Sequence, residues 1–204
     1  FISHLINHWI AQGVKDFVFL LHYESDQISR FLLQISDDPD FINIKFKVVI
    51  EEIPLGTGGS ILNAIHELDI QDSFLVANAD TWLGSGIDVL SAAAPCALAA
   101  VKVPNSQRYG ALRFDGARVD QFQEKSESVG EGYVSSGLYH LSPVIFEQFE
   151  FGSNFSLEED VFPKLVEDKT LGFIKLNTSF IDIGIPEDYL RFCRWVQLGF
   201  KNDI

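Results

Sequence analysis

The chain has 204 residues, of which 47% are hydrophobic and 22% charged, so it can bury the core of one globular domain. Its net charge of −14 at pH 7, with 15 basic residues scattered among 29 acidic ones, argues against nucleic acid as a partner. No apolar run approaches the roughly 20 residues of a membrane span, and no leader pattern opens the chain, so we expect no membrane partner. Cys96 and Cys193 lie in apolar patterns without metal-like spacing, which favours reduced core thiols in a cytoplasmic protein.

The first half of the chain alternates between helical and strand patterns. Strands are predicted at 16–23, 42–51, 73–80 and 96–103, and helices at 2–12, 28–35, 61–68 and 87–93. This βαβαβ rhythm predicts right-handed crossovers, with helices on both faces of a parallel sheet. The strand at 73–80 is apolar for most of its length, so we expect both its faces to be buried in that sheet.

The second half begins with a predicted hairpin over 109–125, which turns at Asp115-Gly116. Ser156-Leu157-Glu158-Glu159 is a capping box that predicts a helix start, and Pro186 is placed to begin the last helix. Further strands are predicted at 132–141, 171–177 and 179–184. We expect one α/β domain over 1–204, a Rossmann-like three-layer sandwich with a mixed, mostly parallel sheet.

A glycine-rich stretch, PLGTGGS, separates the strand at 42–51 from the helix that follows it. Gly56, Gly58 and Gly59 can be there because a tight turn needs backbone angles that other residues avoid. Alternatively, a flat ligand lies against bare backbone beside the N–H groups of a helix N-terminus. The stretch is not a Walker A loop, because the Lys-Ser/Thr ending is absent.

Two aspartates end apolar strands, where ligands of open α/β sheets collect. Asp80 follows the strand at 73–80 together with Asn78, and Asp182 interrupts the strand at 179–184. Each could cap a turn or helix, but a pair of such carboxylates is a candidate site for Mg²⁺, which favours carboxylate and phosphate oxygens.

Three further places have both a plain and a functional interpretation. Glu124-Lys125 is either a solvated charge pair, or a sugar-hydroxyl acceptor beside a cation for phosphate. Tyr109-Gly110 and Gly137 are either ordinary sheet or bulge positions, or places where a ligand approaches the backbone.

With PLGTGG, NAD, YG, EK, SSGLY and FIDIGIPEDY in this order, the chain resembles the sugar-1-phosphate nucleotidylyltransferases. Within that family it is most similar to the D-glycero-D-manno-heptose 1-phosphate and mannose-1-phosphate guanylyltransferases. The resemblance implies that a nucleoside triphosphate and a sugar 1-phosphate give a nucleotide sugar and pyrophosphate, with Mg²⁺ as cofactor. A homo-oligomer is compatible with it.

The resemblance also implies roles for the residues of these motifs. Asp80 and Asp182 would hold the metal, with Lys125 as a catalytic cation on the sugar phosphate. The nucleotide would contact Glu51, Leu55, Gly56, Thr57, Gly58 and Asn78, and the sugar would contact Tyr109, Gly110, Glu124 and Gly137.

Glu51 indicates the base, because an ionised carboxylate only accepts hydrogen bonds. Guanine offers two adjacent donors, N1–H and N2–H₂, whereas uracil and thymine offer a donor beside acceptors. GTP is therefore the favoured nucleotide.

The chain lacks the N-terminal strand and G-G-x-G-T-R triphosphate loop of that family, so we expect it to be a fragment or an enzyme with little activity. The missing loop also leaves open a non-catalytic relative that binds nucleotide or nucleotide sugar. A nucleotide-sugar-dependent glycosyltransferase is a further alternative. Such an enzyme is expected to have an Asp-x-Asp pair, whereas Asn78-Ala79-Asp80 supplies only one carboxylate.

Overall fold

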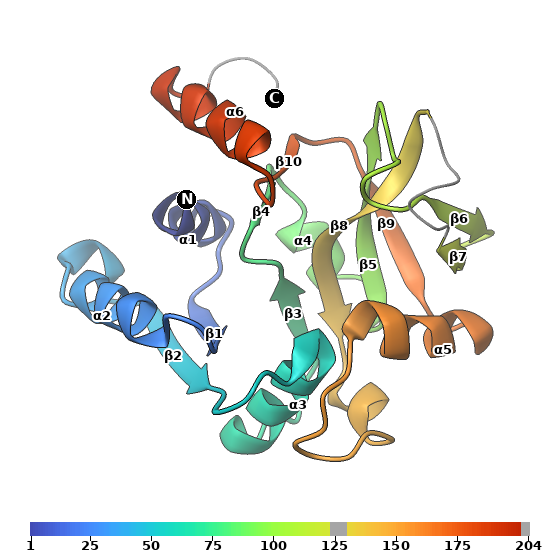
Figure 1. The fold of residues 1–204 in the computed structure, drawn as a ribbon, viewed down its shortest axis with the longest axis horizontal. Coiled ribbons are helices and arrows are strands. Elements are labelled where there is room, and N and C mark those ends of the chain that lie inside the picture. Colours follow the sequence, from blue (N-terminus) through green and yellow to red (C-terminus); the bar gives the residue numbers. More distant parts are fainter. Residues whose placement is uncertain (123–129, 201–204) are drawn as a thin grey trace. The chain divides into compact units, whose positions relative to one another are not determined.

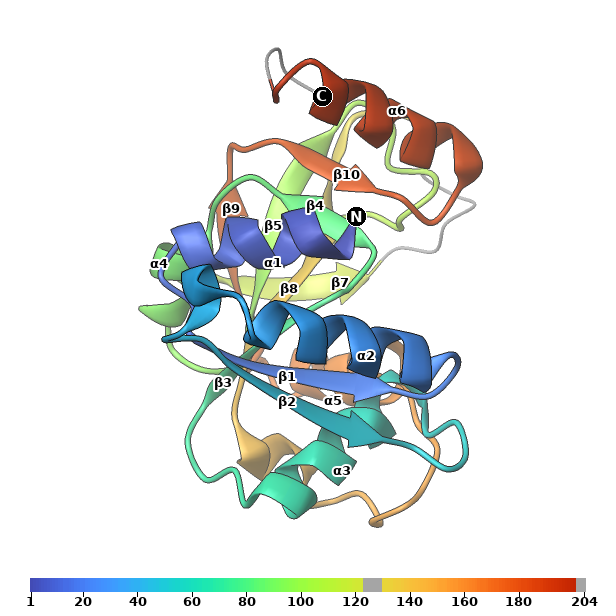
Figure 2. The same ribbon diagram turned by 90° about the vertical axis from the view of Figure 1, so that its left-hand side faces the viewer.

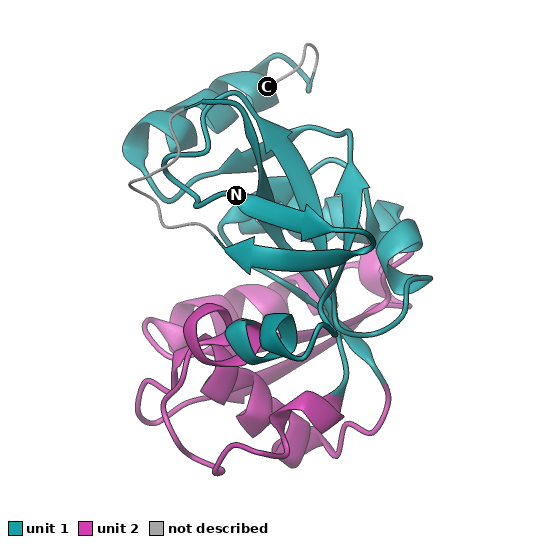
Figure 3. Ribbon diagram, turned by 90° about the vertical axis from the view of Figure 1, so that its right-hand side faces the viewer, with its two compact units in different colours: residues 1–12, 73–142, 163–204 teal, residues 13–72, 143–162 magenta. Residues whose placement is uncertain are grey.

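The computed structural model describes residues 1–122 and 130–200 (Figure 1). It divides into two compact units, coloured separately in Figure 3. Unit 1 contains residues 1–12, 73–142 and 163–204, and unit 2 contains residues 13–72 and 143–162. The expectation of a single domain over 1–204 stays a prediction.

Unit 2 begins with a βαβ element that the sequence pattern predicted. Strands β1 (Asp16–Leu21) and β2 (Lys45–Ile50) pair in parallel, as Figure 2 shows, and helix α2 (Ser25–Ser36) connects them. A 3₁₀ turn, η1 (Pro39–Phe41), follows the helix, and the Asp38 side chain accepts a hydrogen bond from Asp40 N at 3.0 Å. The turn returns the chain to β2.

The remainder of unit 2 packs around helix α3 (Gly56–Leu68), which contacts β1, β2 and the later turns. Those turns are η2 (Pro143–Phe146) and a π-helical turn, η3 (Leu157–Val161), which continues into α5 (Phe162–Glu167). Ser156 Oγ accepts from Glu158 N and Glu159 N, as a capping residue should. The return bond comes from Asp160 rather than Glu159: Asp160 Oδ2 accepts from Ser156 N at 2.8 Å, because the π-helical first turn is wider.

Unit 1 is built on a six-stranded sheet of order β3-β8-β5-β9-β7-β6. Its strands are β3 (Phe74–Ala77), β5 (Ala97–Val103), β6 (Leu112–Asp115), β7 (Arg118–Phe122), β8 (Gly132–Leu141) and β9 (Gly172–Leu176). Only β5 and β9 pair in parallel among these described strands, and the other neighbours are antiparallel. The expectation of a mostly parallel sheet is therefore wrong, although the α/β class is confirmed.

The error has a physical reason in β8. Strands β3 and β5 run in the same direction, as a crossover through helix α4 (Ile87–Ser91) requires. They are not neighbours, however, because β8 lies between them and is antiparallel to both. Strand β3 is also less buried than expected, since its residues are half-buried or exposed.

The core of unit 1 lies at the two central strands. Leu98, Ala99, Ala100 and Val101 of β5 are at most 1% exposed, and β8 is buried along most of its length. Helices α1 (Ile2–Ala11) and α6 (Pro186–Gln197) belong to the same unit, and α6 begins at Pro186 as predicted. Cys96 and Cys193 are free and half-buried rather than fully in the core. No described helix is both long and apolar enough to cross a bilayer.

Candidate functional site

Asp80 and Asp182 lie side by side in unit 1. Strand β4 (Thr81–Leu83) pairs antiparallel with β10 (Phe180–Asp182), and Asp182 is opposite Thr81. Ile183 N donates to Asp80 O at 2.9 Å, which extends the ladder by one step beyond the strands. The two carboxylates predicted from distant parts of the sequence are thus brought to one end of a two-stranded ladder.

Gly184 marks the space between the two carboxylates. A Cβ built on Gly184 would lie 2.9 Å from Asp182 Oδ1 and 3.9 Å from Asp80 Oδ2. A side chain there would crowd the carboxylates, so the glycine keeps this point open. Sequence reasoning did not single out Gly184, although its place in the D-I-G motif was a usable signal.

Each carboxylate is oriented by a neighbouring donor. Gly184 N donates to Asp182 Oδ1 at 2.7 Å, and Thr81 Oγ1 donates to Asp80 Oδ1 at 3.2 Å. The described residues contain no group of three or more His, Cys, Asp and Glu side chains that could hold a metal. The pair of carboxylates from Asp80 and Asp182 nevertheless fits Mg²⁺. In nucleotide sites this ion is held by one or two carboxylates, and phosphate oxygens and water complete its coordination.

Asn78 and Gly137 approach each other closely where β3 and β8 end their pairing. Asn78 N donates to Gly137 O at 2.8 Å, and a Cβ on Gly137 would lie 2.8 Å from Asn78 Nδ2. Gly137 also has φ +71°, a conformation that favours glycine. This contact explains Gly137 structurally, and contact of either residue with a ligand stays a prediction.

Tyr109 and Gly110 belong to a tight turn in which both their backbone N–H groups donate to Ser106 O, at 3.0 and 3.1 Å. The Tyr109 ring packs edge-on against Phe180 of β10, with centroids 5.4 Å apart. Burial raises the pKa of Tyr109, the charge of Arg108 lowers it, and the charges of Asp182 and Asp188 raise it, with a net upward shift. The phenol therefore stays protonated at neutral pH and can donate a hydrogen bond.

Glu51 follows β2 in unit 2 and is buried, at 8% exposed. Its Oε2 accepts from Leu55 N at 3.0 Å, and its backbone N donates to Leu21 O at 2.8 Å. The carboxylate is therefore fixed by the loop that follows it. An ionised carboxylate has further lone pairs with which to accept donors from a ligand.

The glycines of PLGTGGS pack against residues 153–155 of the same unit. A Cβ would lie 2.5 Å from Phe155 O at Gly56, 2.4 Å from the Phe155 ring at Gly58, and 2.5 Å from Ser153 O at Gly59. Phe155 O accepts from Gly58 N and Gly59 N, at 3.0 and 3.3 Å, so these donors of the first turn of α3 are already satisfied. The structure thus supplies a packing reason for the glycines, and their nucleotide contacts stay predictions.

The Thr57 hydroxyl is also engaged within unit 2. Thr57 Oγ1 donates to Glu158 Oε2 at 2.9 Å and accepts from Leu157 N at 2.8 Å.

The predicted site residues are divided between the two units. Unit 2 contains Glu51, Leu55, Gly56, Thr57 and Gly58. Unit 1 contains Asn78, Asp80, Tyr109, Gly110, Gly137 and Asp182. Glu124 and Lys125 lie outside the described residues.

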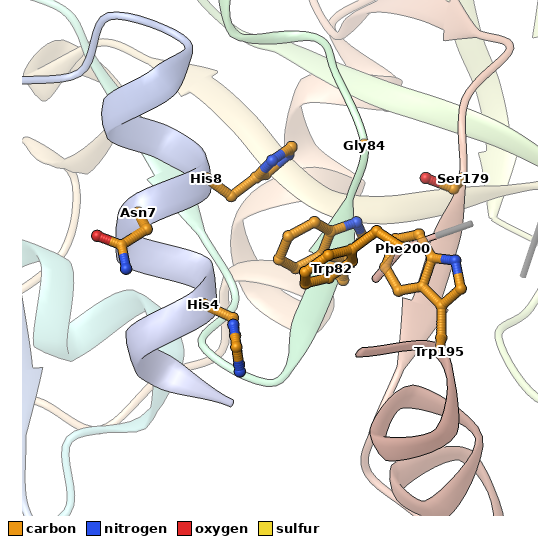
Figure 4. A pocket seen from close by; sticks show the side chains of 8 residues that line it. All are labelled: His4, Asn7, His8, Trp82, Gly84, Ser179, Trp195 and Phe200. Atoms are coloured by element: carbon orange, nitrogen blue, oxygen red, sulfur yellow. The ribbon is translucent and has the colours of Figure 1, made fainter. Parts of the chain in front are cut away.

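A pocket of ≈ 400 Å³ in unit 1 lies beside the β4/β10 ladder, on the face opposite to the Thr81 and Asp182 side chains (Figure 4). Trp82, which pairs with Ile181, lines it and points away from the face of Thr81 and Asp182, since side chains alternate along a strand. His8 of α1 stacks on Trp82 with centroids 4.1 Å apart, and its Nε2 bonds to Leu83 O at 2.7 Å. Helix α1 thus packs, through His8, against the face of the ladder opposite to Asp182.

Comparison with known proteins gives a consistent result. A family model described as "Nucleotidyl transferase" matches residues 1–197. D-glycero-alpha-D-manno-heptose 1-phosphate guanylyltransferase of Campylobacter jejuni is 30% identical over 194 residues, which cover 94% of this chain and 84% of that protein. Mannose-1-phosphate guanylyltransferase of Mycobacterium tuberculosis is 28% identical over 94% of this chain and 54% of its own length.

A solved structure agrees with the sequence matches. HddC from Yersinia pseudotuberculosis, complexed with GMP-PN, has a TM-score of 0.81 and 32% identity, over 96% of this chain and 84% of that chain. By its sequence and its fold, the chain belongs to the nucleotidyl transferase family.

Proposed function

We propose that the protein transfers GMP from GTP to a sugar 1-phosphate of the heptose or mannose type, and releases pyrophosphate. The observation that carries this proposal is the position of Asp80 beside Asp182 at the end of the β4/β10 ladder. The guanylyltransferase relatives and the GMP-PN complex of HddC support the choice of nucleotide.

In this reaction an oxygen of the sugar phosphate forms a bond to the α-phosphorus of GTP. The bond from that phosphorus to the oxygen bridging to the β-phosphate breaks, and pyrophosphate leaves with the electron pair. Mg²⁺, when bound to Asp80 and Asp182, would offset the charge on the phosphate oxygens. The hydrogen bonds from Thr81 and Gly184 use one oxygen of each carboxylate and so hold both groups in a fixed orientation.

Glu51 would select the base by accepting the N1–H and N2–H₂ donors of guanine. Its bond from Leu55 N holds the carboxylate in place before the nucleotide binds, which lowers the cost of ordering it. The remaining nucleotide contacts would come from Leu55, Gly56, Thr57, Gly58 and Asn78.

The sugar would lie against Gly110 and Gly137, with the protonated Tyr109 hydroxyl as a donor to a sugar oxygen. Glu124 would accept from sugar hydroxyls, and Lys125 would meet the sugar phosphate.

Pyrophosphate release with Mg²⁺ tests the proposal, with GTP, ATP, UTP and dTTP each crossed with mannose, heptose and glucose 1-phosphates. The assay is run on the chain of 204 residues. We expect release that requires GTP together with one heptose or mannose 1-phosphate. Release with another nucleotide in place of GTP would contradict the choice of nucleotide, and no release while nucleotide still binds would favour a non-catalytic relative.

A further inference from the structure

An ion pair in unit 1 joins two segments that are far apart in the sequence. Arg108, in the turn of Tyr109 and Gly110, donates from its NH1 group to Asp188 Oδ2 in the first turn of α6. Arg191 contacts the other oxygen of this carboxylate, with NH2 3.3 Å from Oδ1. The Asp188 side chain is only 10% exposed, whereas the Arg108 side chain is 41% exposed.

Arg108 is also linked, through the Tyr109 ring, to the strand that carries Asp182. Its guanidinium lies over the Tyr109 ring, 5.1 Å from the centroid, and that ring packs on Phe180, two residues before Asp182. The hydrogen bond to Asp188 raises the pKa of Arg108, and the nearby charge of Asp182 raises this pKa as well. Arg108 is thus linked to residues before and after Asp182 in the chain. It binds Asp188 directly, and it is linked to Phe180 through the Tyr109 ring.

Stability alone gives a weak reason for this arrangement. A partly buried ion pair gains little net free energy, because removing its charges from water costs about as much as their attraction returns. Its geometry is the more informative feature. A guanidinium has a planar fork of donors and a flat face, so one arginine can bind a carboxylate and stack on a ring at the same time.

We propose that Arg108 is a positioning residue, which ties the Tyr109-Gly110 turn to the β10–α6 segment and so holds the sugar contacts and Asp182 in one geometry. The inference rests on the proposed function for its consequence, because Tyr109 and Gly110 are the predicted sugar contacts and Asp182 the predicted metal ligand. Arg108 is not among the predicted substrate contacts. Loss of the Arg108 side chain should raise KM for the sugar phosphate and leave KM for the nucleotide nearly unchanged.

The first test is amide hydrogen exchange, which needs no activity. Tyr109, Gly110 and Ile183 each have a backbone N–H in a defined hydrogen bond. In Arg108→Gln we expect exchange at all three to rise about tenfold, since both segments lose their tie. Arg191→Gln is the matched control: Arg191 pairs with the same carboxylate from its own helix, so its loss should leave the three amides unchanged.

Arg108→Gln should still fold, because Asp188 keeps Arg191 as a partner and Arg108 is partly exposed. Arg108→Lys is a second variant that preserves the net charge but lacks the planar fork, and we expect the same rise. Faster exchange at Tyr109 and Gly110 but not at Ile183, or an equal rise in Arg191→Gln, would overturn the inference.

The second test measures turnover with GTP and a sugar 1-phosphate. In Arg108→Gln we expect KM for the sugar 1-phosphate to rise about tenfold while KM for GTP stays within about twofold. An equal change in both constants would overturn the inference. If the wild type turns over no pair of substrates, the proposed function fails, and the exchange experiment still decides whether Arg108 ties the two segments.

Discussion

Asp80 and Asp182 are held by backbone geometry rather than by salt bridges. The ladder register and the bond from Ile183 N to Asp80 O bring the two residues together, and Thr81 and Gly184 orient their oxygens. Neither carboxylate is neutralised by an ion pair in the described part of the chain. Two negative charges placed side by side are a natural place for a divalent cation.

Asp80→Asn and Asp182→Asn should each abolish Mg²⁺-dependent pyrophosphate release while the protein stays folded. The amide keeps the shape of the side chain but loses the charge that binds the cation, so the loss should exceed the roughly 10–100-fold effect of removing a second-sphere partner. Initial rates over a Mg²⁺ titration measure this loss, and circular dichroism checks the fold. The exposed Asp72→Asn serves as the control, and full activity in either site variant would remove the metal assignment.

Glu51→Gln should reduce the preference for GTP over UTP and dTTP. The glutamine oxygen can still accept from Leu55 N, so the loop keeps its hydrogen bond, but the amide N–H₂ faces a guanine donor. We expect kcat/KM for GTP to fall by about 10–100-fold, which corresponds to one or two lost hydrogen bonds to a charged group. An unchanged ratio of kcat/KM values between GTP and UTP would mean that Glu51 does not read the base.

Single residues differ in how visible they are in the sequence. Asp80 and Asp182 stand out because a carboxylate at the end of an apolar strand needs a partner or a ligand. Arg108 and Asp188 do not stand out, since each looks like an ordinary surface charge. Their pairing depends on a fold that joins the turn after β5 to the start of α6.

At the scale of elements, the start of α3 is shaped by the segment at 153–158. Phe155 supplies the carbonyl for Gly58 and Gly59, and Asn154 Nδ2 donates to Pro54 O at 2.7 Å. The Phe155 ring stacks on Phe149 with centroids 4.1 Å apart, so it has little room to move. The glycine-rich stretch is therefore part of a close contact between two loops.

Gly58→Ala should destabilise unit 2 through this contact. Alanine in a helix normally gains up to about 1 kcal/mol over glycine, but the new Cβ would meet the Phe155 ring at 2.4 Å. Overpacking costs about 1–3 kcal/mol, so we expect a net loss of roughly 1–2 kcal/mol in the free energy of unfolding. Urea unfolding measures it. Gly172→Ala is the control, because its Cβ would make an ordinary contact of 3.6 Å, and equal stability of the two variants would contradict the packing argument.

The elements themselves were largely predictable, because hydrophobic periodicity and caps are local signals. The βαβ element of β1 and β2, the hairpin of β6 and β7, and the start of α6 at Pro186 all follow from such signals. The order of strands does not, because nothing in the local sequence of β8 shows that it inserts between β3 and β5. The return bond of Asp160 was missed for a similar reason, since a π-helical turn leaves no pattern in the sequence.

For the molecule as a whole, we expect His8 to contribute to the pH dependence of the free energy of unfolding. Burial against Trp82 lowers the pKa of His8 below its usual 6.5, and the bond to Leu83 O opposes this only partly. Below pH 6.5 the unfolded chain therefore takes up a proton that the folded protein resists, so stability falls as the pH drops through that window. Well above pH 6.5 His8 is deprotonated in both the folded and the unfolded state, so it no longer contributes to the slope.

His8→Gln should thus unfold with a weaker pH dependence than the wild type between about pH 7 and pH 5. Urea unfolding at several pH values measures the slope, and the exposed His66→Gln is the matched substitution. The absolute stability of His8→Gln should also be lower, because the ring contact with Trp82 is lost. A slope equal to that of the wild type would show that His8 is not the group that titrates.

Neither unit is continuous in the chain, and this has a consequence for synthesis on the ribosome. The buried strand β5 ends at Val103, but its partners β8 and β9 are complete only at Leu141 and Leu176. The ribosome needs on the order of 4–15 s to add the intervening residues, at ~5–20 residues per second. Until Leu141 is made, β5 has neither neighbour, and until Leu176 is made it still lacks β9, so newly made chains are exposed to aggregation and to chaperones during that time.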